Sequence, residues 1–225
     1  MQQVQAKVCR QGGMLDHIIF DFDGTITDSK RDIAGAQVWV LQQLGVTSYA
    51  AEDLYRYVGK SLEETFSLLL PPELHERIPD AAKMYSEYYR PRSLETTTLF
   101  PGVGETLSTL RLRSKQLAIA STKRGPGIRR ATDHFGITGF FVQLQGSDGF
   151  AHKPDPSIIN KILEDQKWER HATLMVGDTD KDILAGKNAG VKTCAVTYGS
   201  LPENELRLYG PDFVISNFPD LLAIV

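Results

Sequence analysis

The chain has 225 residues, of which 41% are hydrophobic and 24% are charged. These ordinary values exclude a disordered chain and allow one large domain, or a core with an insert. The formal net charge of −3 does not suggest a polyanionic partner, so we expect no binding to nucleic acid.

The N-terminal residues and the cysteines indicate a protein of a reducing compartment. Residues 1–13 are polar and lack the apolar segment of a secretory signal, so we predict a leader that is disordered or extended. No apolar stretch approaches the ~20 residues that a membrane helix requires. The two cysteines, Cys9 and Cys194, form neither a disulfide framework nor a zinc pattern. We therefore expect a cytoplasmic protein that binds no membrane.

From residue 17 onward, short apolar segments alternate with segments of helical pattern. Several short segments are apolar at consecutive positions, which is typical of parallel strands covered on both faces. The expected strands are His17–Asp21, Leu117–Ser121, Phe140–Leu144, Thr173–Gly177, Thr193–Tyr198 and Phe213–Ile215. The expected helices are Val103–Arg113, Gly127–Phe135, Pro156–Asp165, Lys181–Ala189 and Leu201–Tyr209. This alternation predicts an α/β fold, an open parallel sheet with helices on both faces.

Residues 30–98 interrupt the alternation because they carry helical patterns alone, in "IAGAQVWVLQQLG", "SLEETFSLLL" and "RIPDAAKMYSEYYR". The strand–helix pattern restarts at "TTTLFPGVG". We therefore predict an all-helical insert after the first strand. The expected domains are a discontinuous core of residues 14–29 and 99–225 and a small helical domain of residues 30–98.

Polar side chains follow the predicted strands at the points where the strands end. Ligands bind beyond the carboxyl ends of the strands in an open parallel sheet, so we expect these side chains to meet at one edge. They are Asp21 and Asp23 after the first strand, Ser121, Thr122 and Lys123 after the second, Asp178 and Asp182 after the fourth, and Lys153 before a helix.

A cluster of aspartates at this edge predicts phosphoryl-transfer chemistry. Three or four carboxylates repel one another unless a cation lies among them, and Mg²⁺ with oxygen ligands is the natural choice. An aspartate nucleophile forms an aspartyl-phosphate, while Asp23 can protonate the leaving oxygen and then take a proton from water. Ser121, Thr122 and the amides around them can bind phosphate oxygens at a helix N-terminus.

Four segments carry a resemblance to a known family. "DFDGTITDS", "STK", "KPDP" and "GDTDKDILAGKNAG" resemble, in order and spacing, the four motifs of the haloacid dehalogenase-like (HAD) superfamily of phosphohydrolases. The resemblance covers nearly all of residues 15–225. The helical insert is similar to the helical cap of the phosphoglycolate phosphatase-like branch of that superfamily. The implied sheet has the first strand at its centre, between the strands that end at Ser121 and Gly177.

The resemblance also implies a role for each site residue. Asp21 would be the nucleophile and a Mg²⁺ ligand, and Asp23 the acid and base, with its backbone carbonyl on the metal. Asp178 would bind the metal, and Asp182 would bind it directly or through water. Ser121 and Lys153 would hold the transferring phosphoryl group. The expected substrate-binding residues are Gly24, Thr25, Thr122 and Lys123 in the core and Arg56 and Lys60 in the insert.

Simpler structural interpretations stay open for several of these residues. Asp23-Gly24 is a strong turn signal, so the chain after Gly24 could form a small flap hairpin. Ser121 could cap the helix that follows it, and Asp28 and Ser29 are expected to cap the first insert helix. The basic segment "STKRGPGIRR" could be a solvated helix face or a second anionic subsite. Lys181 is expected on a solvated face.

The sequence favours a Mg²⁺-dependent phosphatase that acts on a small phosphorylated metabolite, with phosphoglycolate as the substrate that the family suggests. Pyrophosphate and a nucleotide monophosphate stay open as substrates because fold does not determine substrate. A sugar phosphomutase requires the same four motifs. A phospho-accepting signalling domain or a binding module is the alternative outside enzymes. Both a monomer and a homodimer are compatible with the sequence.

Overall fold

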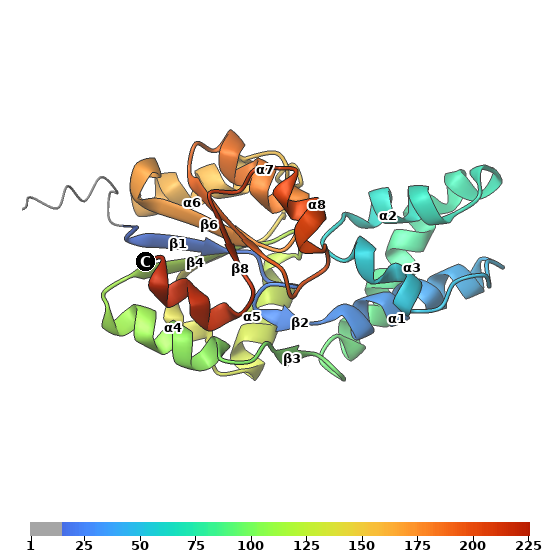
Figure 1. Cartoon of the computed structure of the whole chain (residues 1–225). Helices are drawn as coiled ribbons and strands as arrows, with labels where there is room; N and C mark the ends of the chain where they lie inside the picture. The colour runs from blue at the N-terminus through green and yellow to red at the C-terminus, as the bar shows by residue number, and fades with distance from the viewer. Residues whose placement is uncertain (1–14) are drawn as a thin grey trace, which may run out of the picture.

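The computed structural model describes residues 15–225, which form an open six-stranded sheet with a helical extension at one end (Figure 1). The leader predicted for residues 1–13, Met14 and Cys9 lie outside the described residues. Neighbouring strands pair in parallel in the order β5-β4-β1-β6-β7-β8. The strands are β1 His17–Phe20, β4 Gln116–Ala120, β5 Phe141–Gln145, β6 Thr173–Gly177, β7 Lys192–Val196 and β8 Phe213–Ile215. The predicted α/β fold and the central place of the first strand are confirmed, and each strand begins and ends within two residues of its predicted limits.

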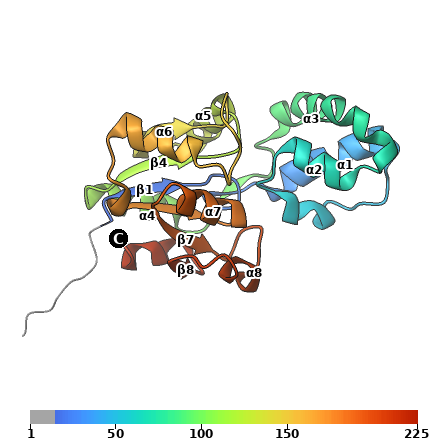
Figure 2. The same ribbon diagram turned by 90° about the horizontal axis from the view of Figure 1, so that it is seen from above.

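Helices cover both faces of the sheet (Figure 2). They are α4 Val103–Leu112, α5 Gly125–His134, α6 Ser157–Gln166, α7 Asp180–Asn188 and the short α8 Glu203–Arg207. Successive side chains of a strand point to opposite faces, and β1 follows this rule. Ile18 and Phe20 pack in one apolar cluster with α4 and α5. Ile19 packs in a second cluster with α6 and α7.

The insert forms an apolar core of its own. Its helices are α1 Lys30–Gln43, α2 Leu62–Leu69 and α3 Ile78–Arg92, and they lie together beyond one end of the sheet (Figures 1 and 2). Ten buried side chains make up its cluster: Ala34, Ala36, Val40, Leu41, Leu54, Phe66, Leu69, Leu70, Ala81 and Tyr85. The insert is therefore stabilised largely by apolar contacts among its own side chains.

The chain enters and leaves the insert through a two-stranded ladder. β2 Thr27–Asp28 pairs antiparallel with β3 Thr98–Leu99. The interpretation that the chain after Gly24 forms a small local hairpin is wrong, because β2 pairs with β3. β3 follows the insert in the sequence and is not among the next few residues after β2. The ladder joins the two connections of the insert beside the end of β1.

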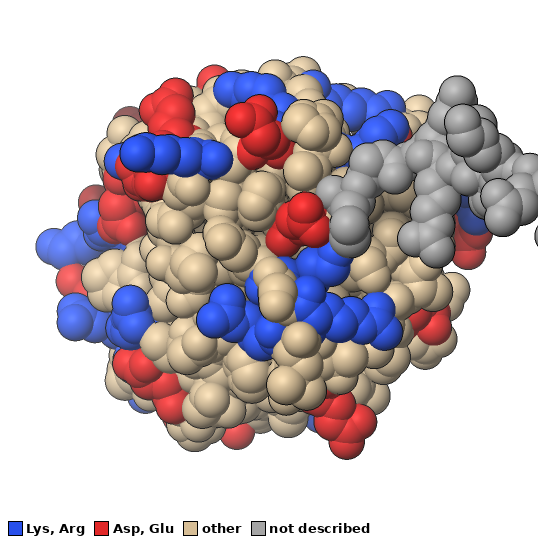
Figure 3. Space-filling view, turned by 90° about the vertical axis from the view of Figure 1, so that its left-hand side faces the viewer, with Lys and Arg blue, Asp and Glu red and all other residues tan. Residues whose placement is uncertain are grey.

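Among residues 15–225, no helix is both long enough and apolar enough to span a membrane. The end of the molecule away from the insert carries basic and acidic side chains in mixture (Figure 3).

Candidate active site

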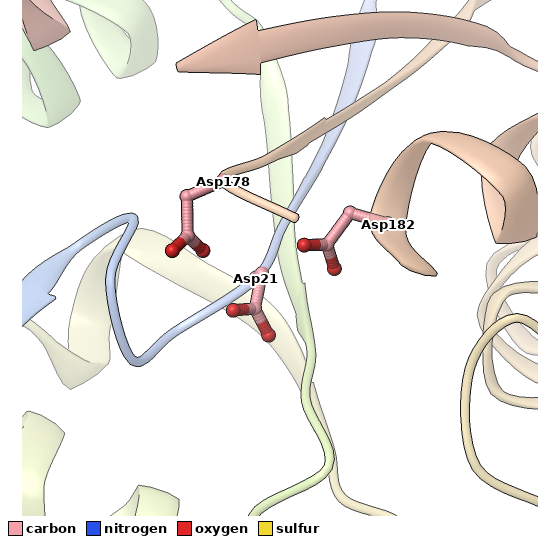
Figure 4. A group of neighbouring side chains, drawn as sticks. All are labelled: Asp21, Asp178 and Asp182. Carbon is pink, nitrogen blue, oxygen red and sulfur yellow. The ribbon is translucent and has the colours of Figure 1, made fainter. Parts of the chain in front are cut away.

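Three aspartates meet where β1 and β6 end. Asp21 follows β1, Asp178 follows β6, and Asp182 lies in the first turn of α7. Their carboxylates lie close together (Figure 4), and one oxygen from each lies within 4.8 Å of the others. All three residues are at most 3% exposed. The structure thus brings together three of the four residues predicted as metal ligands.

Asp178 is held in place by close backbone approach and by hydrogen bonds. The Thr25 hydroxyl donates to its Oδ1 at 3.1 Å, and the Ser200 amide donates to its Oδ2 at 2.7 Å. A Cβ at Gly24 would lie 2.2 Å from Asp178 Oδ2, and one at Gly199 would lie 2.3 Å from the Asp178 Cβ. Glycine is therefore required at both positions for the loops to approach the carboxylate.

Asp182 is oriented by the N-terminus of its own helix. Thr179 is the N-cap of α7 and forms a capping box with Asp182. Asp182 Oδ2 accepts hydrogen bonds from the Thr179 amide at 3.0 Å and from the Thr179 hydroxyl at 2.6 Å. The capping box leaves Oδ1 directed at the site.

Lys153 is the cation among these carboxylates. Its Nζ lies 2.7 Å from Asp21 Oδ1 and 2.5 Å from Asp182 Oδ1, and it donates to the Ala120 carbonyl at 3.1 Å. Burial lowers the pKa of Lys153, but the Asp182 and Asp21 carboxylates outweigh burial and leave that pKa raised. Lys153 is therefore charged at neutral pH.

The site carries more negative than positive charge. Burial raises the pKa of Asp21, and repulsion from Asp182 and Asp178 adds to it, although Lys153 acts in the opposite direction. Burial and Asp182 likewise raise the pKa of Asp178, against hydrogen bonds from Ser200 and Thr25. Three carboxylates facing one ammonium form an oxygen donor set with unbalanced charge, which fits a hard divalent cation.

Asp23 lies apart from the three carboxylates and has partners of its own. Its carboxylate accepts from the Lys123 ammonium at 2.7 and 3.0 Å. The Ser29 hydroxyl donates to Asp23 Oδ1 at 2.7 Å. The prediction that Ser29 caps the first insert helix is only half correct, because Ser29 is the N-cap residue of α1 while its side chain makes no capping hydrogen bond.

Ser121 and Thr122 follow β4 on the side of β1 opposite Asp178. Ser121 is 1% exposed, and its hydroxyl oxygen accepts from the Lys123 amide at 3.2 Å. The suggestion that Ser121 caps the next helix is wrong, since α5 begins at Gly125 with Arg124 as its N-cap. The Thr122 hydroxyl donates to the Gly59 carbonyl at 3.4 Å, so this loop contacts the insert.

Arg56 and Lys60 reach the core from the insert side. Both line a pocket of about 160 Å³ between the insert and the start of α7, together with Thr179 and Lys181. Glu64 of α2 pairs with Lys60 at 2.7 Å and with Lys181 of α7. The solvated position expected for Lys181 is wrong, because its side chain is 14% exposed and bridges the core to the insert.

The contacts of Ser29, Lys181 and Tyr89 are the part of this site that the sequence analysis missed. Tyr89 of α3 accepts a hydrogen bond from Lys123 at 3.0 Å. Lys123 itself lies two residues after the predicted strand that ends at Ser121, and this position is the sequence signal that placed Lys123 among the expected site residues. Tyr89 has no comparable signal, because an aromatic residue in an amphipathic helix is ordinarily part of the core.

Comparison with known proteins agrees with this geometry. A family model described as haloacid dehalogenase-like hydrolase matches residues 18–196. A phosphoglycolate phosphatase of Aquifex aeolicus is 32% identical over 92% of this chain and 95% of its own length. Pyrophosphatase PpaX of Halalkalibacterium halodurans is 31% identical over 94% of this chain and 97% of its own length. The crystal structure of a haloacid dehalogenase-like hydrolase from Bacteroides fragilis has a TM-score of 0.87 and 29% identity, covering 92% of this chain and 99% of that one.

The chain therefore belongs to the haloacid dehalogenase-like hydrolases and is an enzyme, a phosphatase of that family.

Proposed function

We propose that this enzyme hydrolyses a small phosphorylated metabolite through an aspartyl-phosphate formed on Asp21. The observation that carries the proposal is the buried cluster at the end of the central strand, where Asp21 lies with Asp178, Asp182 and Lys153. Phosphoryl transfer depends mostly on positioning and charge neutralisation, and this cluster offers both. The low cysteine content supports the cytoplasm as the location of the reaction.

Mg²⁺ is the proposed cofactor. The Asp21, Asp178 and Asp182 carboxylates would hold it with the backbone carbonyl of Asp23, and their oxygen donors suit this ion. When bound, Mg²⁺ neutralises charge on the transferring phosphoryl group. Ser121 and Lys153 would hold the phosphoryl oxygens, with Gly24, Thr25 and Thr122 alongside.

The proposed reaction has two steps. An Asp21 oxygen attacks phosphorus, the bond from phosphorus to the leaving oxygen breaks, and Asp23 gives that oxygen a proton. Asp23 then takes a proton from water as the water oxygen attacks the aspartyl-phosphate. The bond between phosphorus and Asp21 breaks, which releases inorganic phosphate and restores both aspartates.

The substrate is proposed to carry a second anionic group beside its phosphoryl group. Relatives of this chain are named phosphoglycolate phosphatase and pyrophosphatase PpaX, so phosphoglycolate is the first candidate and pyrophosphate the second. Arg56 and Lys60 line the pocket between insert and core, where Asp180 and Glu205 also lie and Lys60 pairs with Glu64. Arg56 is therefore the residue of this pocket that supports an anionic substrate. We propose that residues 30–98 form a cap domain that excludes water when the site is closed.

Phosphate release from a panel of phosphorylated metabolites tests this function. The panel includes phosphoglycolate, pyrophosphate, sugar phosphates and nucleotide monophosphates, each with Mg²⁺ and with EDTA. We expect release that requires Mg²⁺ and that falls by at least about 10³-fold in Asp21→Asn, because the nucleophile is lost. Asp16→Asn is the control, since Asp16 precedes β1 at the opposite end of the same strand. Release that persists in Asp21→Asn would remove Asp21 as the nucleophile, and product phosphorylated at a new position would indicate a mutase.

A further inference from the structure

The side chains of Asp23, Lys123 and Tyr89 form a hydrogen-bonded chain from the core to the insert. Lys123, in the loop between β4 and α5, places its Nζ 2.7 and 3.0 Å from the two Asp23 carboxylate oxygens. The same Nζ donates to the Tyr89 hydroxyl of α3 at 3.0 Å. The Lys123 and Asp23 side chains are only 14% and 10% exposed. The contact is therefore a shielded ion pair whose lysine is held from the insert.

We propose that Lys123 is a positioning residue that aligns Asp23 for proton transfer, and that Tyr89 keeps Lys123 in place when the insert lies against the core. This inference rests on the proposed role of Asp23 as acid and base. According to this inference, the insert helps to align the acid and base residue through Tyr89, in addition to excluding water.

The need for Tyr89 follows from the nature of a lysine side chain. A lysine ends in a compact charge on a flexible four-carbon stem and does not fix its own direction. The Tyr89 hydroxyl accepts from the ammonium, and the Tyr89 ring lies under it at 5.1 Å. Tyr85, which is buried in the insert core, stacks on Tyr89 at 5.1 Å. The lysine is thus fixed by a ring that belongs to the packed insert.

The remaining contact of Asp23 also depends on the insert. Ser29, whose hydroxyl donates to Asp23 Oδ1, is the residue from which α1 begins. Movement of the insert away from the core would withdraw Tyr89 and would disturb Ser29. The Asp23 carboxylate would then keep only the flexible Lys123 side chain as a partner, and efficient proton transfer requires hydrogen-bond distance to the leaving oxygen.

The leaving group reveals whether a variant has misplaced Asp23. Phenyl phosphate and p-nitrophenyl phosphate differ by one nitro group, which stabilises the leaving phenolate anion. The p-nitrophenyl ester needs little protonation of its leaving oxygen, whereas the phenyl ester depends on it more. Both esters give the same aspartyl-phosphate, so kcat/KM, which reports the step that releases the phenol, is the informative quantity. Loss of aligned acid catalysis lowers kcat/KM more for the phenyl ester, whereas partial unfolding lowers it equally for both esters.

The experiment measures kcat and KM for both esters in Lys123→Met, Lys123→Arg and Tyr89→Phe. We expect Lys123→Met to reduce kcat/KM on the order of 10²-fold for phenyl phosphate and less than about tenfold for p-nitrophenyl phosphate. Tyr89→Phe shows the same preference with a smaller effect, and Lys123→Arg recovers part of kcat/KM. Tyr88→Phe and Lys161→Met are the matched controls, because Tyr88 stacks on Trp39 and Lys161 pairs with Asp165 within α6. Circular dichroism checks that each variant is folded.

Asp23→Asn separates the failure of this inference from the failure of the proposed function. If Asp23→Asn lowers kcat/KM equally for both esters, the assignment of Asp23 as the acid is wrong and the inference fails with it. If Asp23→Asn is selective and Lys123→Met instead raises KM equally for both esters, Lys123 is a phosphate ligand and only the positioning role is overturned. Tyr89→Phe with unchanged kinetics for both esters would overturn the part assigned to the insert.

Discussion

Gly24 shows at the scale of one residue how the loop after β1 comes to lie beside Asp178. Its φ is +90°, a region that L side chains rarely adopt. A Cβ there would also lie 2.2 Å from Asp178 Oδ2, which is far inside van der Waals contact. Both the backbone conformation and the space therefore require glycine between Asp23 and Thr25.

Gly24→Ala is expected to destabilise the protein and to abolish most phosphate release, because the loop or Asp178 must move to admit the methyl group. We expect at least about 2 kcal/mol lost from the free energy of unfolding, measured by urea denaturation. Gly35→Ala is the opposite control. Gly35 lies within α1, and an added Cβ there meets no described atom within 4 Å. That variant should gain about 0.5–1 kcal/mol from helix propensity. Equal stability of the two variants would contradict this account of Gly24.

The side chains at the strand ends could be predicted because the location depends only on strand order and direction. Asp21, Asp178 and Lys153 each stand beside an apolar strand or a helix start that the sequence makes visible. The partners of Asp23 could not be found in this way. Lys123 is 100 positions away from it in the chain, and its ion pair depends on how a flexible side chain packs.

At the scale of elements, α7 presents Asp182 to the site. The apolar pattern of residues 181–189 predicts this helix, and the structure begins it one residue earlier, at Asp180. One carboxylate oxygen of Asp182 accepts from Thr179 and the other faces Lys153. The capping interaction of α7 and the geometry of the site therefore share one side chain.

Thr179→Ala is expected to weaken both the capping of α7 and the positioning of Asp182. Loss of the N-cap hydroxyl should lower the free energy of unfolding by about 1 kcal/mol, and phosphate release should fall because Asp182 Oδ2 loses a partner. Urea denaturation and initial rates measure the two effects. Thr179→Ser keeps the hydroxyl and is expected to stay close to the native protein. A serine variant that is as impaired as the alanine variant would assign the effect to the methyl group.

Other elements had no signal that could have revealed them. The six strands of the sheet show apolar runs of up to four residues, but β2 and β3 have two residues each. Their pairing joins positions about 70 residues apart, so it follows from how the insert returns to the core. The turn signal at Asp23-Gly24 therefore predicts a local hairpin, whereas β2 pairs with the distant β3.

At the scale of the whole molecule, insert and core are two packed units joined by polar contacts. The buried side chains of the insert form one apolar cluster, and those of the sheet and its helices form others. The polar contacts between the two units are those of Lys181 with Glu64, Lys123 with Tyr89, Thr122 with Gly59, and Arg130 with Ser93. Leu94 of the insert adds an apolar contact with the core cluster. Units joined by a polar interface are expected to move relative to each other, which agrees with a cap that opens for substrate.

The ion pair of Lys181 and Glu64 is a contact between the two units that includes none of the proposed reacting groups, so it tests this motion separately. Hydrogen bonds from Lys181 and Lys60 lower the pKa of Glu64 against the opposing effect of burial, so Glu64 is ionised at neutral pH. Lys181→Met should change the free energy of unfolding by only about 0–1 kcal/mol, because the Glu64 carboxylate stays 34% exposed.

The same variant should increase the population of open molecules, since the lost contact joins the insert to the core and would be broken when the insert moves away. We expect faster amide hydrogen exchange in α2 and around Gly59, with unchanged exchange in β1 and β6, which belong to the core. High salt should produce a similar acceleration in the native protein, because it screens a partly exposed pair. Lys161→Met is the control, as its ion pair with Asp165 lies within a single helix. If exchange around Gly59 is the same in Lys181→Met and in the control, the ion pair does not hold the insert against the core, and the remaining contacts, which include those of Tyr89, Gly59 and Ser93, do so.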